Sequence, residues 1–163
     1  MIEDFKRRLE FIHRMSVEFA KAVPDDKWRF TPAPSGPSDP ERRGEGFAPF
    51  CKQLRHVVGV RGVYAEAIAT KKADFAKKHA HYSGDLSRAS LLAGLEAANQ
   101  LMIENLDHAD IAAPIDFFGR AFSFADVTYT IVQHEAIHHG QWSVYALLGG
   151  FQTPRTWRVE WGL

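Results

Sequence analysis

The chain has 163 residues, which is enough for one domain with a substantial hydrophobic core. Hydrophobic residues make up 45% of it and charged residues 25%, the proportions of an ordinary soluble globular protein. The 20 basic residues balance the 20 acidic ones, so no overall field favours nucleic acid or an anionic membrane as a partner.

The first residues and the cysteine content indicate a compartment. The one cysteine, Cys51, excludes an internal disulfide and is compatible with a reducing environment. The segment Met1–Arg8 is too charged for a signal peptide, and no uncharged apolar run approaches membrane-spanning length. We therefore expect a single cytoplasmic domain over residues 1–163, with neither nucleic acid nor a membrane as partner.

Helical periodicity of apolar residues predicts four long helices. Their expected ranges are 2–23, 48–69, 87–106 and 124–148. Prolines and glycines between 24 and 46 predict an irregular connection after the first helix. The lysines between 71 and 78 favour a solvated connector over a binding patch.

The stretch between the third and fourth helices has a different character. Residues 107–122 are rich in aromatic and β-branched side chains and contain Gly119, which predicts a short extended excursion or a small hairpin. Ser123 and Asp126 fit a capping box that opens the fourth helix, and Gly149-Gly150 ends it. The predicted fold is all-α: a four-helix bundle with a short irregular or hairpin excursion before the last helix.

Two histidines stand on the apolar face of the fourth helix. His134 and His138 are four residues apart, so they point inward from consecutive turns with Cβ atoms about 6 Å apart. At that separation they can share a divalent cation at about 2.0–2.1 Å per bond, whereas two unpartnered buried rings would each cost about 1–3 kcal/mol. We interpret them as metal ligands; the alternative is a pair of core histidines that find hydrogen bonds.

His56 on the second helix is half-turned toward the interior and is the candidate for a third ligand. The alternative is that His56 binds no metal and hydrogen-bonds a neighbouring backbone or carboxylate group. Glu135 lies about 100° around the helix from His134. It is either a general base facing the metal pocket or a surface carboxylate at its rim. Gln141, one turn after His138, is predicted to hydrogen-bond a ligand rather than to be one.

These residues carry a resemblance to a known family. The segments Leu54–Val57 and His134–Gln141, together with Trp28–Pro32 and Leu147–Gly149, resemble the DinB/YfiT-like metal-binding four-helix bundles in order and spacing. Members typically have His-x3-His followed by Arg-Gly-Gln, and here His139 stands at the arginine position. This difference puts in doubt any anion contact made from that position.

The resemblance implies an up-down-down-up bundle, commonly a homodimer, with a divalent metal, usually Zn or Ni. The ligands would be His56, His134 and His138. It also implies a choice of activities on a small-molecule substrate: transfer of a low-molecular-weight thiol, a thiol-dependent isomerisation, or metal-dependent hydrolysis. We expect a thiol S-transferase-like or hydrolase-like enzyme, because three protein ligands leave a coordination position open.

Two alternatives belong to other classes. One is a dimeric metal-binding bundle without turnover, a binding or stress-related module, which a fourth protein ligand closing the site would favour. The other is a zinc protease, since His134–His138 also fits His-Glu-x-x-His. That interpretation is weaker: Val144 stands where the extended motif needs histidine, and Glu160, the other possible third ligand, lies in a short tail after Pro154.

Overall fold

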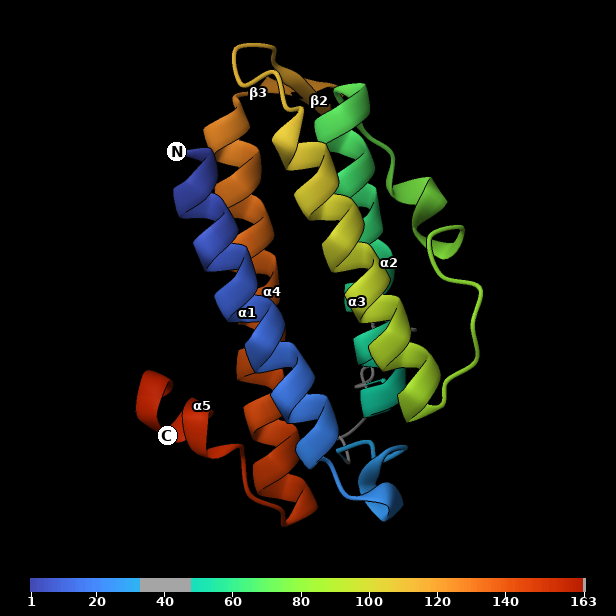
Figure 1. Cartoon of the computed structure of the whole chain (residues 1–163). Coiled ribbons are helices and arrows are strands. Elements are labelled where there is room, and N and C mark those ends of the chain that lie inside the picture. Colours follow the sequence, from blue (N-terminus) through green and yellow to red (C-terminus); the bar gives the residue numbers. More distant parts are fainter. Residues whose placement is uncertain (33–47, 163) are drawn as a thin grey trace, which may run out of the picture.

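The computed structural model describes residues 1–32 and 48–162, and its framework is a bundle of four long helices (Figure 1). They are α1 (Ile2–Ala22), α2 (Phe50–Thr70), α3 (Arg88–Asp107) and α4 (Phe124–Gly149). The predicted four-helix bundle is confirmed, and each predicted helix end lies within two residues of the observed one. Residues 33–47, which hold most of the predicted irregular connection, lie outside the described residues.

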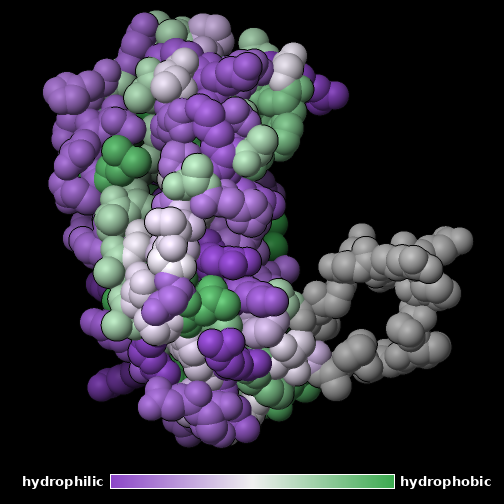
Figure 2. Space-filling view, turned by 90° about the vertical axis from the view of Figure 1, so that its right-hand side faces the viewer, coloured by the Kyte–Doolittle hydropathy of each residue, from purple (hydrophilic) through white to green (hydrophobic). Residues whose placement is uncertain are grey.

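The helices are not in simple alternation. α1 and α4 run in one direction and α2 and α3 in the other, so α2 and α3 are parallel (Figure 1). The segment 71–87 therefore returns along the length of the bundle beside α2, and it contains the short helix η2 (Phe75–His79). Two further short helices are η1 (Asp25–Lys27) and α5 (Arg155–Trp161). The side that carries α3 and η2 is largely hydrophilic (Figure 2).

Local sequence sets the ends of α3 and α4. The Ser123 hydroxyl accepts a hydrogen bond from Asp126 N at 3.1 Å, and the Asp126 carboxylate accepts one from Ser123 N at 3.1 Å, which is the predicted capping box. Gly150, with φ of 71°, follows the last turn of α4 in the left-handed conformation that glycine adopts at little cost. The Ser87 hydroxyl likewise accepts a hydrogen bond at the start of α3, from Ser90 N.

The excursion before α4 is the predicted hairpin. Strands β2 (Ile115–Phe117) and β3 (Arg120–Phe122) pair antiparallel across Phe118 and Gly119, whose φ angles of 56° and 76° suit a two-residue hairpin turn. Strand β1 (Lys72–Ala73) pairs parallel with β2. Sequence periodicity missed β1 because two residues are too few to show an alternation.

The core has two hydrophobic clusters separated by a polar layer. One cluster lies toward the hairpin and includes Ile12 and Ile131; the other lies toward the opposite end and includes Phe19 and Trp142. Cys51 is 1% exposed in the second cluster, as expected for a packing residue. The buried polar residues at the level between the clusters are Ser16, Arg61, Glu135, His138 and His139.

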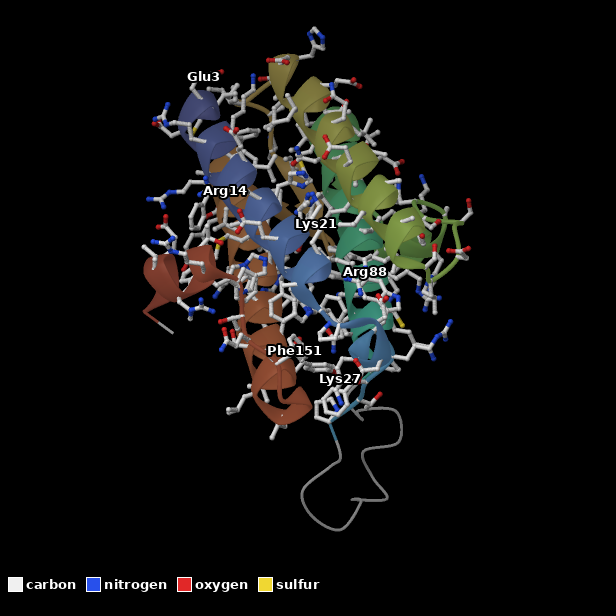
Figure 3. All side chains as sticks on the ribbon, turned by 60° about the horizontal axis from the view of Figure 1, so that its bottom comes forward. Glu3, Arg14, Lys21, Lys27, Arg88 and Phe151 are labelled. Atoms are coloured by element: carbon white, nitrogen blue, oxygen red, sulfur yellow. The ribbon has the colours of Figure 1, made fainter. Side chains whose placement is uncertain are left out.

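Charged and aromatic side chains close the end of the bundle opposite the hairpin. Arg88 of α3 donates hydrogen bonds to the carbonyl oxygens of Ala20 (3.0 Å) and Val23 (2.6 Å), where α1 ends and its dipole favours a cation (Figure 3). α5 brings Trp157 into the core, where its Nε1 donates to Met15 O at 2.9 Å.

Among the described helices, none combines the length and the apolar composition that a membrane crossing requires.

Candidate metal centre

Three histidines from two helices converge in the polar layer. His56 of α2 and the pair His134 and His138 of α4 place one ring nitrogen each within 4.8 Å of the other two. His134 Nε2 lies 3.2 Å from His56 Nε2 and 3.2 Å from His138 Nε2. The structure thus brings together the three residues that the sequence and the family resemblance indicated as ligands.

The chemistry of these rings fits a divalent cation. Burial, reinforced by the neighbouring imidazoles, lowers the pKa of His56, His134 and His138 to about 4, so all three are neutral near pH 7. Neutral imidazole is the form that binds a metal. Nitrogen atoms held at about 2.0–2.1 Å from one tetrahedral ion are about 3.3 Å apart, close to the separations found here.

A glutamine of α2 orients one of the candidate ligands. Gln53 Oε1 lies 3.0 Å from His138 Nδ1, so the ring donates its Nδ1 proton to the amide oxygen and keeps a lone pair on Nε2. Gln53 precedes His56 by three residues, on the same face of α2, and sequence reasoning did not single it out. Gln141 also lies near the His138 ring. Its Oε1 finds no hydrogen-bond partner among the described residues, and its predicted role stays a prediction.

Glu135 is neither at the rim nor free. It is 2% exposed, so the surface alternative is wrong, and its carboxylate is paired with the buried guanidinium of Arg61. Arg61 Nε donates to Oε1 at 2.8 Å and a terminal nitrogen donates to Oε2 at 2.6 Å. Burial alone would raise the pKa of Glu135, but Arg61 outweighs it and holds that pKa below its ordinary value. The general-base role stays a prediction, and it requires one oxygen to turn away from Arg61.

The ion pair belongs to a network that reaches the other helices. Arg61 also donates to His13 Nδ1 at 2.7 Å, and His13 Nε2 lies 3.0 Å from a carboxylate oxygen of Glu96 on α3. Ser16 of α1 lies 2.8 Å from His139 Nε2. His139 thus faces α1 and not the histidine triad. The side chain of His13 is only 12% exposed, because it packs over Arg61.

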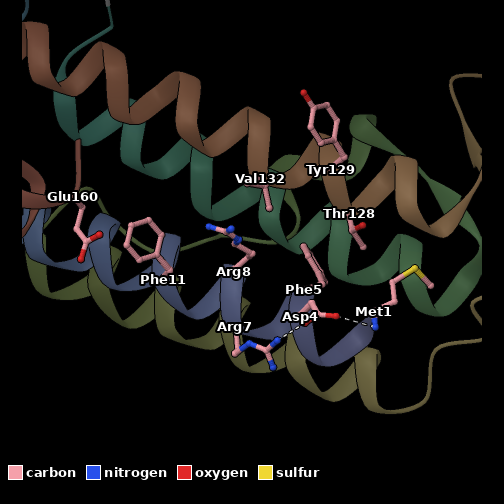
Figure 4. Close-up of a pocket in the computed structure, with 10 residues that line it drawn as sticks. All are labelled: Met1, Asp4, Phe5, Arg7, Arg8, Phe11, Thr128, Tyr129, Val132 and Glu160. Carbon is pink, nitrogen blue, oxygen red and sulfur yellow. Dashed lines mark hydrogen bonds and ion pairs between the residues drawn. The ribbon is translucent and has the colours of Figure 1, made fainter. Parts of the chain in front are cut away.

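Two cavities bear on the choice of site. One, of about 480 Å³, has His56 among its lining residues. Another, of about 1000 Å³, lies between α1 and α4, and Asp4, Arg7, Arg8 and Glu160 give it charges of both signs (Figure 4). Glu160 therefore lies at the second cavity and is not part of the ligand group, which His56 completes. This placement argues against the protease arrangement.

A family model decides the relationship of this chain to known proteins. The model of the DinB superfamily matches residues 8–142, which is most of the chain. The chain belongs to the DinB superfamily. Among solved structures, this DinB-superfamily chain is similar to a DinB-like protein from Bacillus cereus, with 19% identity and a TM-score of 0.71. It is also similar to a DinB-like protein from Bacillus subtilis, with 15% identity and a TM-score of 0.67.

Both alignments cover 93% of this chain and 95% of the other. At these identities the likeness shows the shared fold alone. Among curated proteins, none matches the chain. The candidate metal centre of this DinB-superfamily protein therefore rests on its own residues. Within the described residues, no fourth histidine, cysteine or carboxylate joins the three candidate ligands, which is the pattern of a site with an open coordination position.

Proposed function

We propose that this protein is a divalent-metal-dependent enzyme that acts on a small molecule by transfer of a low-molecular-weight thiol or by hydrolysis. The observation that carries the proposal is the convergence of three neutral imidazoles with no fourth protein ligand among the described residues. Zn and Ni suit a site of three nitrogen ligands. A cation held there supplies Lewis acidity, which lowers the pKa of a water or thiol near it.

The residues around the triad have separate tasks in this proposal. His56, His134 and His138 hold the ion, and the acceptor oxygen of Gln53 keeps the His138 ring in the tautomer that can bind it. The Arg61–Glu135 pair fixes α4 against α2, the two helices that supply the ligands. The cavity that His56 lines is where a small substrate would reach the site.

A homodimer is part of the same proposal. Its support is the outward side of α4, where apolar side chains recur at helical spacing without a covering element in the described chain. The exposed members are Tyr129, Ile137, Val144, Leu147 and Leu148. A helix face of this kind is covered in an assembled protein by another chain.

The first test is metal content. Protein purified without chelator, or reloaded with Zn²⁺ or Ni²⁺, should carry close to one ion per chain by elemental analysis. Chelator should lower the melting temperature, since an ion that binds only the folded state stabilises it. His56→Ala, His134→Ala and His138→Ala should each abolish tight binding, whereas the controls His79→Ala and His81→Ala should keep it. Equal losses in all five variants, or no ion after reloading, would refute the site.

The second test separates catalysis from binding. Metal-loaded protein should be assayed with a panel of cellular thiols and a chlorinated aromatic electrophile, and separately with simple esters and amides. Turnover that disappears in His134→Ala establishes an enzyme and selects transfer or hydrolysis. A fully loaded protein without turnover in either assay would favour the metal-binding module instead.

A further inference from the structure

The cavity of about 480 Å³ is formed by two parts of the chain that face each other. One wall is the first half of α2, with Lys52, Arg55, His56 and Gly59; the other is the segment 78–84 after α2. Its volume is in the range of small-molecule sites. His56, one of the three candidate ligands, is among the lining residues, so the cavity lies next to the candidate metal centre.

The charge of this cavity is of one sign. Lys52, Arg55 and Lys78 line it together with the His79 ring, and no aspartate or glutamate of the described chain does. None of the three cations forms an ion pair with a described residue, while the neighbouring Lys77 is neutralised by Glu66 at 2.9 Å. The 1000 Å³ cavity, by contrast, has both signs. The whole chain has 20 basic and 20 acidic residues, so the excess of positive charge in this cavity does not come from an overall positive charge of the protein.

The cations lie close to the ligand histidine. The positive charge of Lys78 and the ring of His79 both contribute to lowering the pKa of His56, after the larger effect of burial. Lys52 precedes His56 by four residues, so both side chains lie on one face of α2. A molecule in the cavity would therefore lie beside both the cations and His56.

Glycines of α2 allow the second wall to come this close. A Cβ atom at Gly59 would lie 2.5 Å from the carbonyl oxygen of Lys78, and one at Gly62 would lie 2.6 Å from the Cβ of His81. Any larger residue would push the segment outward. The two glycines are three residues apart, on one side of α2, so the returning segment rests directly on the helix and carries Lys78 to the cavity.

We propose that this cavity binds an anionic group, a carboxylate or a phosphate, of the small molecule on which the metal centre acts. Unpaired lysine and arginine side chains are the groups that proteins use for such anions. The sequence predicted that the lysines between 71 and 78 form a solvated surface. In this proposal Lys77 is paired at the surface, and Lys78 faces the ligand. The part of this inference that makes the anion a substrate of the metal centre rests on the proposed function. The binding of an anion in the cavity does not.

The first experiment tests anion binding without reference to metal or turnover. Protein as purified is acetylated briefly with and without succinate, using uncharged succinamide at equal ionic strength as the matched control, and each lysine is followed by mass spectrometry. Succinate should slow acetylation of Lys52 and Lys78, and leave the exposed Lys72 unchanged as an internal control. Equal protection of all three lysines, or equal effects of succinate and succinamide, would overturn the proposal.

The second experiment tests the adjacency to the metal centre. Cobalt(II)-loaded protein is titrated with 3-mercaptopropionate and its neutral isostere 3-mercaptopropionamide, and binding is read from the cobalt absorption spectrum. The anionic thiol should bind about tenfold more tightly, and added salt should reduce the preference. The variant Lys52→Gln/Arg55→Gln/Lys78→Gln should lose it, whereas the control Lys72→Gln should retain it.

The outcomes separate the two proposals. Protein that takes up cobalt and binds both thiols equally would overturn the anion site and leave the metal-dependent function standing. The anion site is likewise overturned if the preference survives in the triple variant. Protein that takes up no cobalt but shows succinate protection at Lys52 and Lys78 would refute the proposed function and keep the anion site. If neither thiol binds the loaded protein, the succinate result alone decides.

Discussion

At the scale of single residues, one hydrogen bond determines whether His138 can act as a ligand. A neutral imidazole has a proton on one nitrogen and a lone pair on the other, and the acceptor at Nδ1 selects which is which. Gln53 Oε1, at 3.0 Å, is that acceptor. Gln53 is in turn within 3.5 Å of the Tyr145 hydroxyl, so its amide is held from both sides.

We predict that Gln53→Leu, which keeps the size of the side chain but removes the acceptor, weakens metal affinity by about 10- to 100-fold. The measurement is a competition titration against a chromophoric chelator. Gln133→Leu is the matched control, since Gln133 is exposed on α4. An affinity for Gln53→Leu equal to that of the control would mean that the His138 tautomer does not depend on this contact.

Residue positions were predictable where helix periodicity determines them. The four-residue spacing puts His134 and His138 on one inward face of α4. The apolar stripe of α2 puts His56 on the inward side of that helix. The hydrogen-bond partners of Gln53 and Glu135 could not be predicted from the sequence, because a partner depends on which helix lies opposite and at what height. Arg61 on the apolar stripe of α2 was the available signal, since a buried arginine requires a buried carboxylate.

At the scale of elements, the Arg61–Glu135 pair joins α2 to α4 at the level of the candidate metal centre. Both side chains are buried, and the two hydrogen bonds of the pair fix the rotation of one helix against the other. Taking two charges out of water is costly, so the pair contributes mainly through its geometry, and an unpaired partner is strongly destabilising.

We predict that Arg61→Met lowers the free energy of unfolding by about 3–5 kcal/mol, because it leaves the Glu135 charge buried without a partner. Urea denaturation followed by circular dichroism measures the loss. The double variant Arg61→Met/Glu135→Leu should recover most of it, and Arg8→Met, at an exposed position, should change little. If the double variant were as unstable as the single one, the network with His13 and Ser16 would be the stabilising element instead of the pair.

Element prediction succeeded for long segments and failed for short ones. The four helices span many periods of apolar residues, and capping residues at Ser87 and Ser123 mark two of their starts. β1 is two residues long and exists only because β2 lies beside it. The placement of segment 78–84 over His56 depends likewise on the close approach at Gly59, which no local pattern discloses.

At the scale of the whole molecule, the two faces of α4 differ in character. The inward face carries His134 and His138 of the candidate metal centre, and the outward face presents apolar side chains. Ile137 is 55% exposed and Leu147 is 78% exposed. A Cβ built on Gly140, in the middle of this face, meets nothing within 4 Å, so a helix of a second copy has room to approach there. On α3, by contrast, Leu101 is the one large hydrophobic residue that is exposed, among the residues that the structure describes.

We therefore predict a homodimer in which the outward face of α4 is buried, and in which Ile137→Lys/Val144→Lys gives a monomer. Light scattering after size exclusion measures the mass, and retained metal content shows that the variant is folded. The control Leu101→Lys, on α3, also places a lysine at an exposed apolar position and should leave the dimer intact. If the unchanged protein is monomeric at every concentration, the dimer is excluded. If the double variant is still a dimer, the contact lies elsewhere. Because the ligands point inward from the same helix, dissociation should leave metal affinity nearly unchanged, which separates assembly from the chemistry of the centre.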